Sequence, residues 1–109
     1  MKLLTRKEFL ELKENVLFSK YQPHVFGYLS IKDKRIENDF LYQQICDSVE
    51  CESSEDFDNI LNKAHINKSS FDIDLGCLSR DGCYDDKEMF AVWEKKDINK
   101  LINSLEKCL

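Results

Sequence analysis

The acidic residues of this chain are concentrated in its middle. Between Ile36 and Asn62 there are eight acidic side chains and no Lys or Arg. The eight are Glu37, Asp39, Asp47, Glu50, Glu52, Glu55, Asp56 and Asp58. Residues 36–90 hold fourteen acidic against four basic residues, whereas residues 1–35 hold eight basic against four acidic. If the middle folds onto one side, the protein presents a strongly negative region, and such a field selects partners.

Length and composition indicate one globular domain. The chain has 109 residues, of which 42% are hydrophobic, including seven Phe, four Tyr and one Trp. This is enough for a single core without disulfides or metals, so we expect one domain over residues 1–109. No apolar run approaches the roughly 20 residues of a membrane span, and residues 1–10 lack the apolar stretch of a signal peptide. We therefore expect a cytoplasmic protein that does not contact a membrane.

Three segments have the pattern of helices. Thr5 and Glu8 form a capping box, which predicts a helix that runs to about Lys13. A second helix is expected to begin at Ser53 or Ser54, with an apolar residue at positions i, i+3, i+4 and i+7. The apolar stripe of the second helix is Phe57, Ile60, Leu61 and Ala64. A third helix is expected after Asp97, and its apolar face is Ile98, Leu101, Ile102, Leu105 and Leu109.

Between these helices the pattern favours strands. β-Branched and aromatic residues predict strands at residues 16–21 and 25–32, on either side of a turn at 22–24. Further strands are predicted at residues 40–45, 71–75 and 89–94, and a turn at residues 79–82. The predicted fold is therefore α+β: a mostly antiparallel sheet of about five strands, with N-terminal, central and C-terminal helices packed on it.

Catalytic and metal-binding patterns are weak in this sequence. The five cysteines are Cys46, Cys51, Cys77, Cys83 and Cys108. Four residues separate the first close pair and five the second, whereas about two to four residues usually separate paired ligands of structural zinc. We expect free thiols that pack as small apolar groups, and neither a metal nor a cofactor. His24 and His65 lie in no nucleophile motif, and Asp81, Asp85 and Asp86 are interpreted as a solvated turn. The sequence thus favours binding over enzymatic turnover.

Two runs near the ends of the chain match a pattern seen in other proteins. They are LTRKEFL at residues 4–10, and RDGCYDD at 80–86 followed by MFAVWEKKD at 89–97 and LI at 101–102. In these runs the chain resembles small phage and prophage proteins, which are short cytoplasmic proteins made by the virus inside its bacterial host. The resemblance implies a task such as modulating or blocking a host system. It carries no active-site residues with it.

The charge pattern leads to a first hypothesis about function. A net charge of −5 opposes direct nucleic-acid binding, because phosphate recognition needs a broad positive surface. We expect a non-enzymatic, counter-defence type inhibitor whose acidic face binds a host protein with a basic surface. The expected contact residues are Asp47, Glu50, Glu52, Asp58 and, as an apolar anchor, Tyr42 or Val49. The alternative reading of the same carboxylates is a solvated face that only keeps the protein soluble.

A second hypothesis belongs to another class of protein. The chain could sequester a small ligand, such as a nucleotide signal, in a pocket between the protomers of a homo-oligomer. Aromatic stacking and cationic phosphate ligands would then be needed. The candidates are Tyr21, Tyr28, Lys34, Arg35 and Arg80.

Overall fold

The computed structural model describes residues 1–46 and 48–109 and shows an α+β fold, as the sequence predicts. Seven strands form one antiparallel sheet with the order β1-β7-β2-β4-β5-β6, and β3 pairs with β2 off this path. The strands are β1 (Lys2–Thr5), β2 (Val16–Gln22), β3 (Val25–Phe26), β4 (Ser30–Ile36), β5 (Asp39–Gln44), β6 (Ser79–Arg80) and β7 (Met89–Val92). The helices are α1 (Arg6–Leu10), α2 (Ser54–Asn67) and α3 (Lys95–Glu106).

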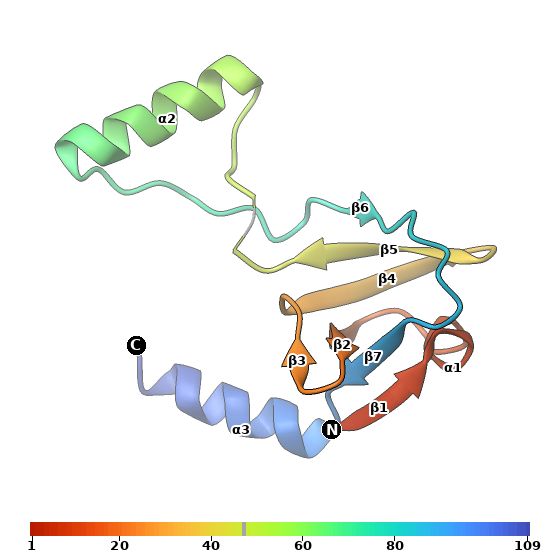
Figure 1. The fold of residues 1–109 in the computed structure, drawn as a ribbon. Helices are drawn as coiled ribbons and strands as arrows, with labels where there is room; N and C mark the ends of the chain where they lie inside the picture. The colour runs from red at the N-terminus through yellow and green to blue at the C-terminus, as the bar shows by residue number, and fades with distance from the viewer. Residues whose placement is uncertain (47) are drawn as a thin grey trace.

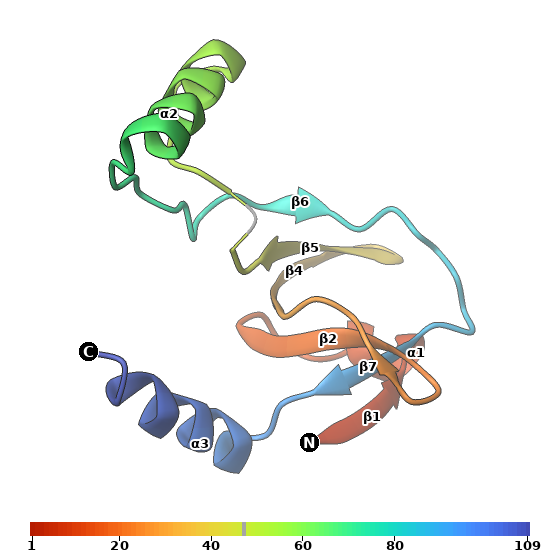
Figure 2. The same ribbon diagram turned by 60° about the vertical axis from the view of Figure 1, so that its left-hand side comes forward.

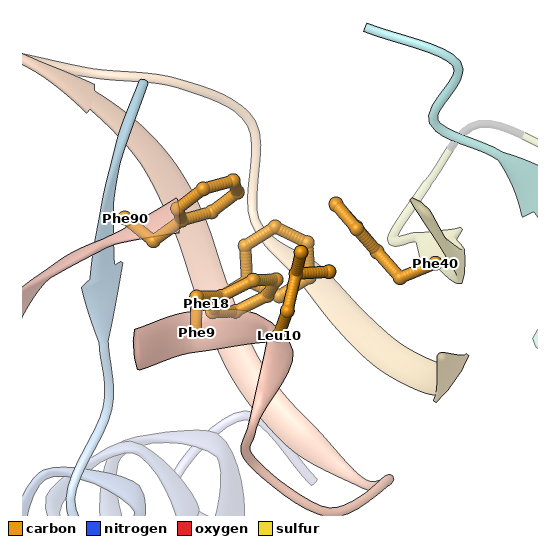
Figure 3. Packing of buried hydrophobic residues seen from close by; sticks show 5 residues of the cluster. All are labelled: Phe9, Leu10, Phe18, Phe40 and Phe90. Carbon is orange, nitrogen blue, oxygen red and sulfur yellow. The ribbon is translucent and has the colours of Figure 1, made fainter. Parts of the chain in front are cut away.

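The buried core lies between α1 and one face of the sheet. Phe9 of α1 stacks on Phe90 of β7 with ring centroids 4.0 Å apart, and also contacts Phe18 of β2 and Phe40 of β5. Leu10 completes the cluster (Figure 3). The strand register explains this arrangement, because Phe18 and the Lys20 partner of Phe90 are two residues apart on β2, so Phe18 and Phe90 point to the same face. One short helix thus covers the centre of the sheet.

The other two helices bury no residue. In both ribbon views α2 lies apart from the sheet, at the end of two extended segments, and α3 extends from the end of β7 (Figures 1 and 2). The radius of gyration is 16.3 Å, above the roughly 13 Å expected of a compact domain near 100 residues. Of the three helices, α1 is the one that contributes to the buried core.

Several predicted boundaries were wrong. Residues 71–75 alternate strictly but form no strand; Ile73 makes only an isolated antiparallel bridge with Val49. The predicted turn at 79–82 begins with β6, and the predicted strand at 25–32 is divided into β3 and β4. The first helix ends at Leu10 rather than near Lys13, although its capping box is present as predicted.

Two further elements differ from the prediction at the chain ends. Residues 2–5, for which no strand was predicted, form β1, which pairs with β7. The third helix begins at Lys95, because Glu94 serves as its N-cap and Asp97 lies in its first turn. Met1 contributes to this end of the fold, because its amino group lies 2.8 Å from a carboxylate oxygen of Glu94.

Candidate functional site

The net charge of the protein lies on one projecting segment. Residues 48–76, here called the acidic arm, leave the sheet after β5 and return before β6 (Figure 1). Seven acidic side chains belong to the arm, against the two basic residues Lys63 and Lys68. The seven are Glu50, Glu52, Glu55, Asp56, Asp58, Asp72 and Asp74. Because the rest of the chain has fourteen acidic and fourteen basic residues, the arm holds the entire net charge of −5.

The two stems of the arm are held together by backbone hydrogen bonds. The amide of Glu50 donates to the carbonyl of Asp72, and the amide of Asp74 donates to the carbonyl of Ser48, both at 2.9 Å. The bridge between Val49 and Ile73 lies between these two bonds. Residues at the base of the arm are therefore fixed relative to each other.

The carboxylates at the start of α2 have different tasks. Ser53 caps the helix by accepting a hydrogen bond from the amide of Asp56 at 3.1 Å, and Asp56 in turn accepts from the amide of Glu52. Acidic side chains in a first turn also favour the helix through its dipole. Asp56 thus has a local structural role. Glu50, Glu52 and Asp58 are exposed, and none of them forms an ion pair with any described residue.

The structure brings only part of the expected acidic face together. Glu52 and Asp58 line one shallow depression together with Cys51 and Phe57. Glu50 lines a neighbouring part of the arm, beside Lys63 and Phe71. Asp47 lies outside the described residues.

Tyr42, the first of the two expected apolar anchors, is not part of the arm. It lies half-buried on β5, with its ring centroid 6.1 Å from that of Phe40. Its strand is the one from which the chain continues toward the arm. The candidate residues therefore divide into an acidic set on the arm and an aromatic residue on the sheet.

A second group of charges lies on α1, the strands of the sheet and the loops between them outside the arm, here called the sheet module, and is internally neutralised. Arg6 of α1 is only 3% exposed and donates to Glu88 at 3.0 Å, to Asp81 at 3.3 Å and to the carbonyl of Asn38 at 2.8 Å. Lys20 of β2 lies 2.7 Å from the same two carboxylates. Burial alone would lower the pKa of Lys20, but its hydrogen bonds to Asp81 and Glu88 outweigh it and raise the pKa.

Asp39 is the most enclosed carboxylate of this group. It is fully buried, and it accepts hydrogen bonds from Nε of Arg80 at 2.7 Å and from the amides of Phe40 and Gly82. Burial on its own would raise the pKa of Asp39, but these hydrogen bonds, led by that of Arg80, hold it below its usual value. The three cations and three carboxylates of this network therefore neutralise one another and stabilise the fold.

One group in this region has the composition of a metal site. Ligand atoms of Asp81, Cys83 and Glu88 lie within 4.8 Å of one another. Both carboxylates, however, are already neutralised by Arg6 and Lys20. The group is best described as part of the ion-pair network. All five cysteines are exposed free thiols, so the expectation that they pack as buried apolar groups was wrong.

The residues of the ligand-sequestering hypothesis are dispersed. Arg80 is paired with Asp39 and donates to the hydroxyl of Tyr84 at 2.9 Å. Tyr21 packs against Phe26, with ring centroids 5.3 Å apart. Lys34 is exposed on β4, Arg35 lines a depression near α1, and Tyr28 lines a different pocket.

The pocket beside Tyr28 was not predicted from the sequence. It has a volume of about 230 Å³ and opens on the same face of the sheet as the core. Its lining comes from β2, β4, β5 and the loop after β3: Phe18, Lys20, Gly27, Tyr28, Ser30, Phe40, Tyr42, Gln44 and Asp81. Ser30 of β4 is paired with Phe18 of β2 on one side and with Gln44 of β5 on the other. Because the serine side chain is small, it leaves this space between its larger neighbours. Such a gap depends on strand register, which the sequence pattern did not reveal.

The comparisons with known proteins add no relative. None of the family models, curated proteins and solved structures compared with the chain matches it. Among the described residues, no helix combines the length and the apolar character that crossing a membrane requires.

Proposed function

We propose that this protein acts by binding, and that its acidic arm docks on a basic surface of a partner protein. The observation that supports this most is the location of the net charge. All of it lies on a segment whose helix buries no residue, whereas the fourteen acidic and fourteen basic residues of the rest of the chain cancel. A charged element that contributes so little to the core is available for contact with a partner.

The exposed carboxylates of the arm would carry the electrostatic part of this contact. Glu50, Glu52 and Asp58 are exposed without a cationic partner among the described residues, so a cation from another protein can approach them. Charge complementarity of this kind accelerates association and weakens as salt rises. The resemblance of both chain ends to small phage proteins suggests a bacterial host protein as the partner, with inhibition of a host system as the outcome.

Binding without turnover fits the chemistry of the sheet module. Its clustered carboxylates are already paired with Arg6, Lys20 and Arg80, so they are not free to act as acids, bases or metal ligands. The ligand-sequestering alternative has less support. Arg80 is engaged by Asp39, and Tyr28 and Arg35 line different depressions.

Charge reversal on the arm tests the proposal. The tagged protein would be incubated with bacterial lysate at low and high salt, and the bound proteins identified. In the triple variant Glu50→Lys, Glu52→Lys, Asp58→Lys we expect the captured protein to be lost. Wild type should retain it at low salt and release it at high salt.

The matched control places the same charge change on the sheet module and on α3. Glu11→Lys, Glu14→Lys and Glu106→Lys alter three exposed carboxylates outside the arm, and this variant should capture the partner as wild type does. Equal loss in both triple variants would show that total charge, rather than the arm, governs capture. Unchanged capture by the arm variant would contradict the proposal.

A further inference from the structure

The pocket beside Tyr28 is built to take a ring. Its base is formed by the buried aromatic residues Phe18 and Phe40, and Tyr28 and Tyr42 add two more aromatic side chains to its lining. Tyr28 itself is 78% exposed, so one side of the pocket is a side chain that solvent surrounds. Aromatic rings favour tilted or offset contacts with other rings, which a lining of four aromatic side chains can supply.

A few polar groups interrupt this apolar lining. Ser30 lines the pocket although the residue is almost fully buried. Gln44, which has a side-chain carboxamide, lines it from the neighbouring strand β5. Both can accept a hydrogen bond from the N–H or O–H at the edge of a ring. Pockets of this type, mostly apolar with a few placed polar groups, fix the orientation of what they bind.

The size and charge of the pocket exclude a nucleotide. Its volume of about 230 Å³ is below the range of about 300–1,000 Å³ typical of sites for whole small molecules. Its one cation, Lys20, is held by Asp81 and Glu88 at 2.7 Å, so no free positive charge is available for a phosphate. Asp81, which also lines the pocket, is paired with Lys20 and Arg6, so no free carboxylate is available for a guanidinium either. These features leave a neutral aromatic side chain as the best fit.

We propose that this pocket receives an aromatic side chain, Trp or Tyr, from the partner protein that the acidic arm attracts. The proposal rests on the proposed function. Tyr42 and Gln44 lie on β5, the strand from which the chain continues toward the arm, so charge contact and ring insertion would take place on connected parts of one surface. Aromatic side chains that fill a pocket are the usual energetic centre of an interface, while surrounding charges steer the encounter.

Titration with amino-acid amides tests the pocket without the partner. The probes are N-acetyl-tryptophanamide, N-acetyl-tyrosinamide, N-acetyl-argininamide and adenosine monophosphate, followed by amide shifts in ¹H–¹⁵N NMR spectra. We expect the two aromatic amides to shift the signals of Gly27, Tyr28, Ser30 and Gln44 in a saturable way. Absence of shifts up to the solubility limit, or shifts caused by the arginine or adenosine probe instead, would overturn the proposal.

Two variants provide an independent check. Ser30→Leu fills the pocket from below, and Tyr28→Ala removes an exposed part of its lining without touching the core. Both should abolish the shifts caused by the aromatic amides, and both should weaken partner binding about tenfold or more. Tyr84→Ala is the matched control, because Tyr84 is an exposed tyrosine that does not line the pocket. If Ser30→Leu does not fold, Tyr28→Ala decides the question.

The outcomes distinguish this proposal from the proposed function. If reversal of the arm charges abolishes capture but Tyr28→Ala leaves it intact, the arm binds the partner and the pocket does not. If the aromatic amides bind but lysate yields no captured protein, the arm proposal fails while the pocket remains a site for aromatic rings.

Discussion

Single residues in the sheet module show how the fold distributes its charges. Arg6 is nearly fully buried and contacts Asp81, Glu88 and the carbonyl of Asn38, so one side chain connects α1 to the loop between β6 and β7 and to the turn between β4 and β5. Removing one partner of a buried ion pair leaves the other charge uncompensated, which is far costlier than losing an exposed pair.

We predict that Arg6→Met destabilises the protein by roughly 3 kcal/mol, because Asp81 and the buried Asp39 lose a nearby cation. Lys7→Met is the control: Lys7 is the exposed neighbour on the same helix, and its loss should change stability by less than about 0.5 kcal/mol. Urea unfolding followed by circular dichroism measures both. Equal effects of the two substitutions would contradict this role for Arg6.

Lys32 is the opposite case, a buried cation that forms no ion pair with a carboxylate of any described residue. It is 1% exposed, and Nζ donates to the carbonyls of Leu12 and Asp33 at 2.9 and 3.4 Å. Burial, with the nearby Arg35, lowers the pKa of Lys32. The buried charge therefore lowers the free energy of unfolding, and this cost is fully present at every pH below the lowered pKa. The cost disappears as pH rises from the lowered pKa to the unfolded value of 10.5.

We predict that Lys32→Met stabilises the protein by about 1 kcal/mol at neutral pH, because the apolar side chain keeps the contact with Phe9 and removes the buried charge. The gain should shrink as pH approaches 10.5, where the wild-type lysine becomes neutral in both states. Lys34→Met, on an exposed position of the same strand, should show neither effect. A destabilised Lys32→Met variant would mean that the two carbonyl hydrogen bonds outweigh the cost of burial.

Asp39 gives the fold a dependence on acid. Its folded pKa lies below its unfolded value, so its contribution is present above the ordinary carboxyl pKa of about 3.9 and is lost as pH falls through the folded pKa. The unfolding free energy of wild type should therefore fall in this acidic window. In Asp39→Asn, which lacks the titrating carboxylate, we expect it to fall less over the same window. Parallel pH profiles of unfolding free energy for the two proteins would contradict this.

At the scale of elements, local signals were predicted well and pairing was not. Thr5, Ser53 and the apolar stripes identify the helices because capping and helical periodicity are properties of neighbouring residues. Residues 71–75 alternate like a strand, but Ile73 has only Val49 opposite it in an isolated bridge. β1 was not predicted, because its strand character comes from pairing with β7, more than 80 residues away.

The same reasoning applies to the candidate site. The carboxylates Glu50, Glu52 and Asp58 were identified from charge alone, because a run of acids must remain near solvent. The pocket beside Tyr28 was not predicted, because it depends on the register that places Ser30 opposite Phe18 and Gln44. The separation of the acidic arm from the sheet could not be deduced either, since the stripe on α2 is typical of a helix packed on a core.

Because α2 buries no residue, we expect the arm to unfold independently of the sheet. We predict that Ser53→Ala lowers the stability of α2 by about 1 kcal/mol, because the hydrogen bond from the amide of Asp56 to the Ser53 hydroxyl is lost. The stability of the sheet should not change. Hydrogen exchange can measure this residue by residue: protection should fall in residues 54–67 and stay constant in β2, β4 and β7. A parallel loss of protection in the strands would show that α2 and the sheet unfold together.

The whole molecule combines a negative arm with a remainder of the chain that has no net charge. Six residues with opposite charges neutralise each other around Arg6, while the arm holds the full net charge of −5. The long-range field of the protein therefore originates from the arm, and α2 is not needed to complete the core. A partner would approach the arm first and meet the pocket next.

The most direct test is to remove the outer part of the arm, which carries α2, Glu52 and Asp58, and measure capture. Residues 51–71 would be replaced by a short Gly-Ser linker, which keeps the hydrogen bond between Ser48 and Asp74 and all of the sheet. We predict a folded protein with a thermal midpoint close to that of wild type and no captured partner from low-salt lysate. A folded, arm-deleted protein that still captures the same partner would contradict the role of the acidic arm.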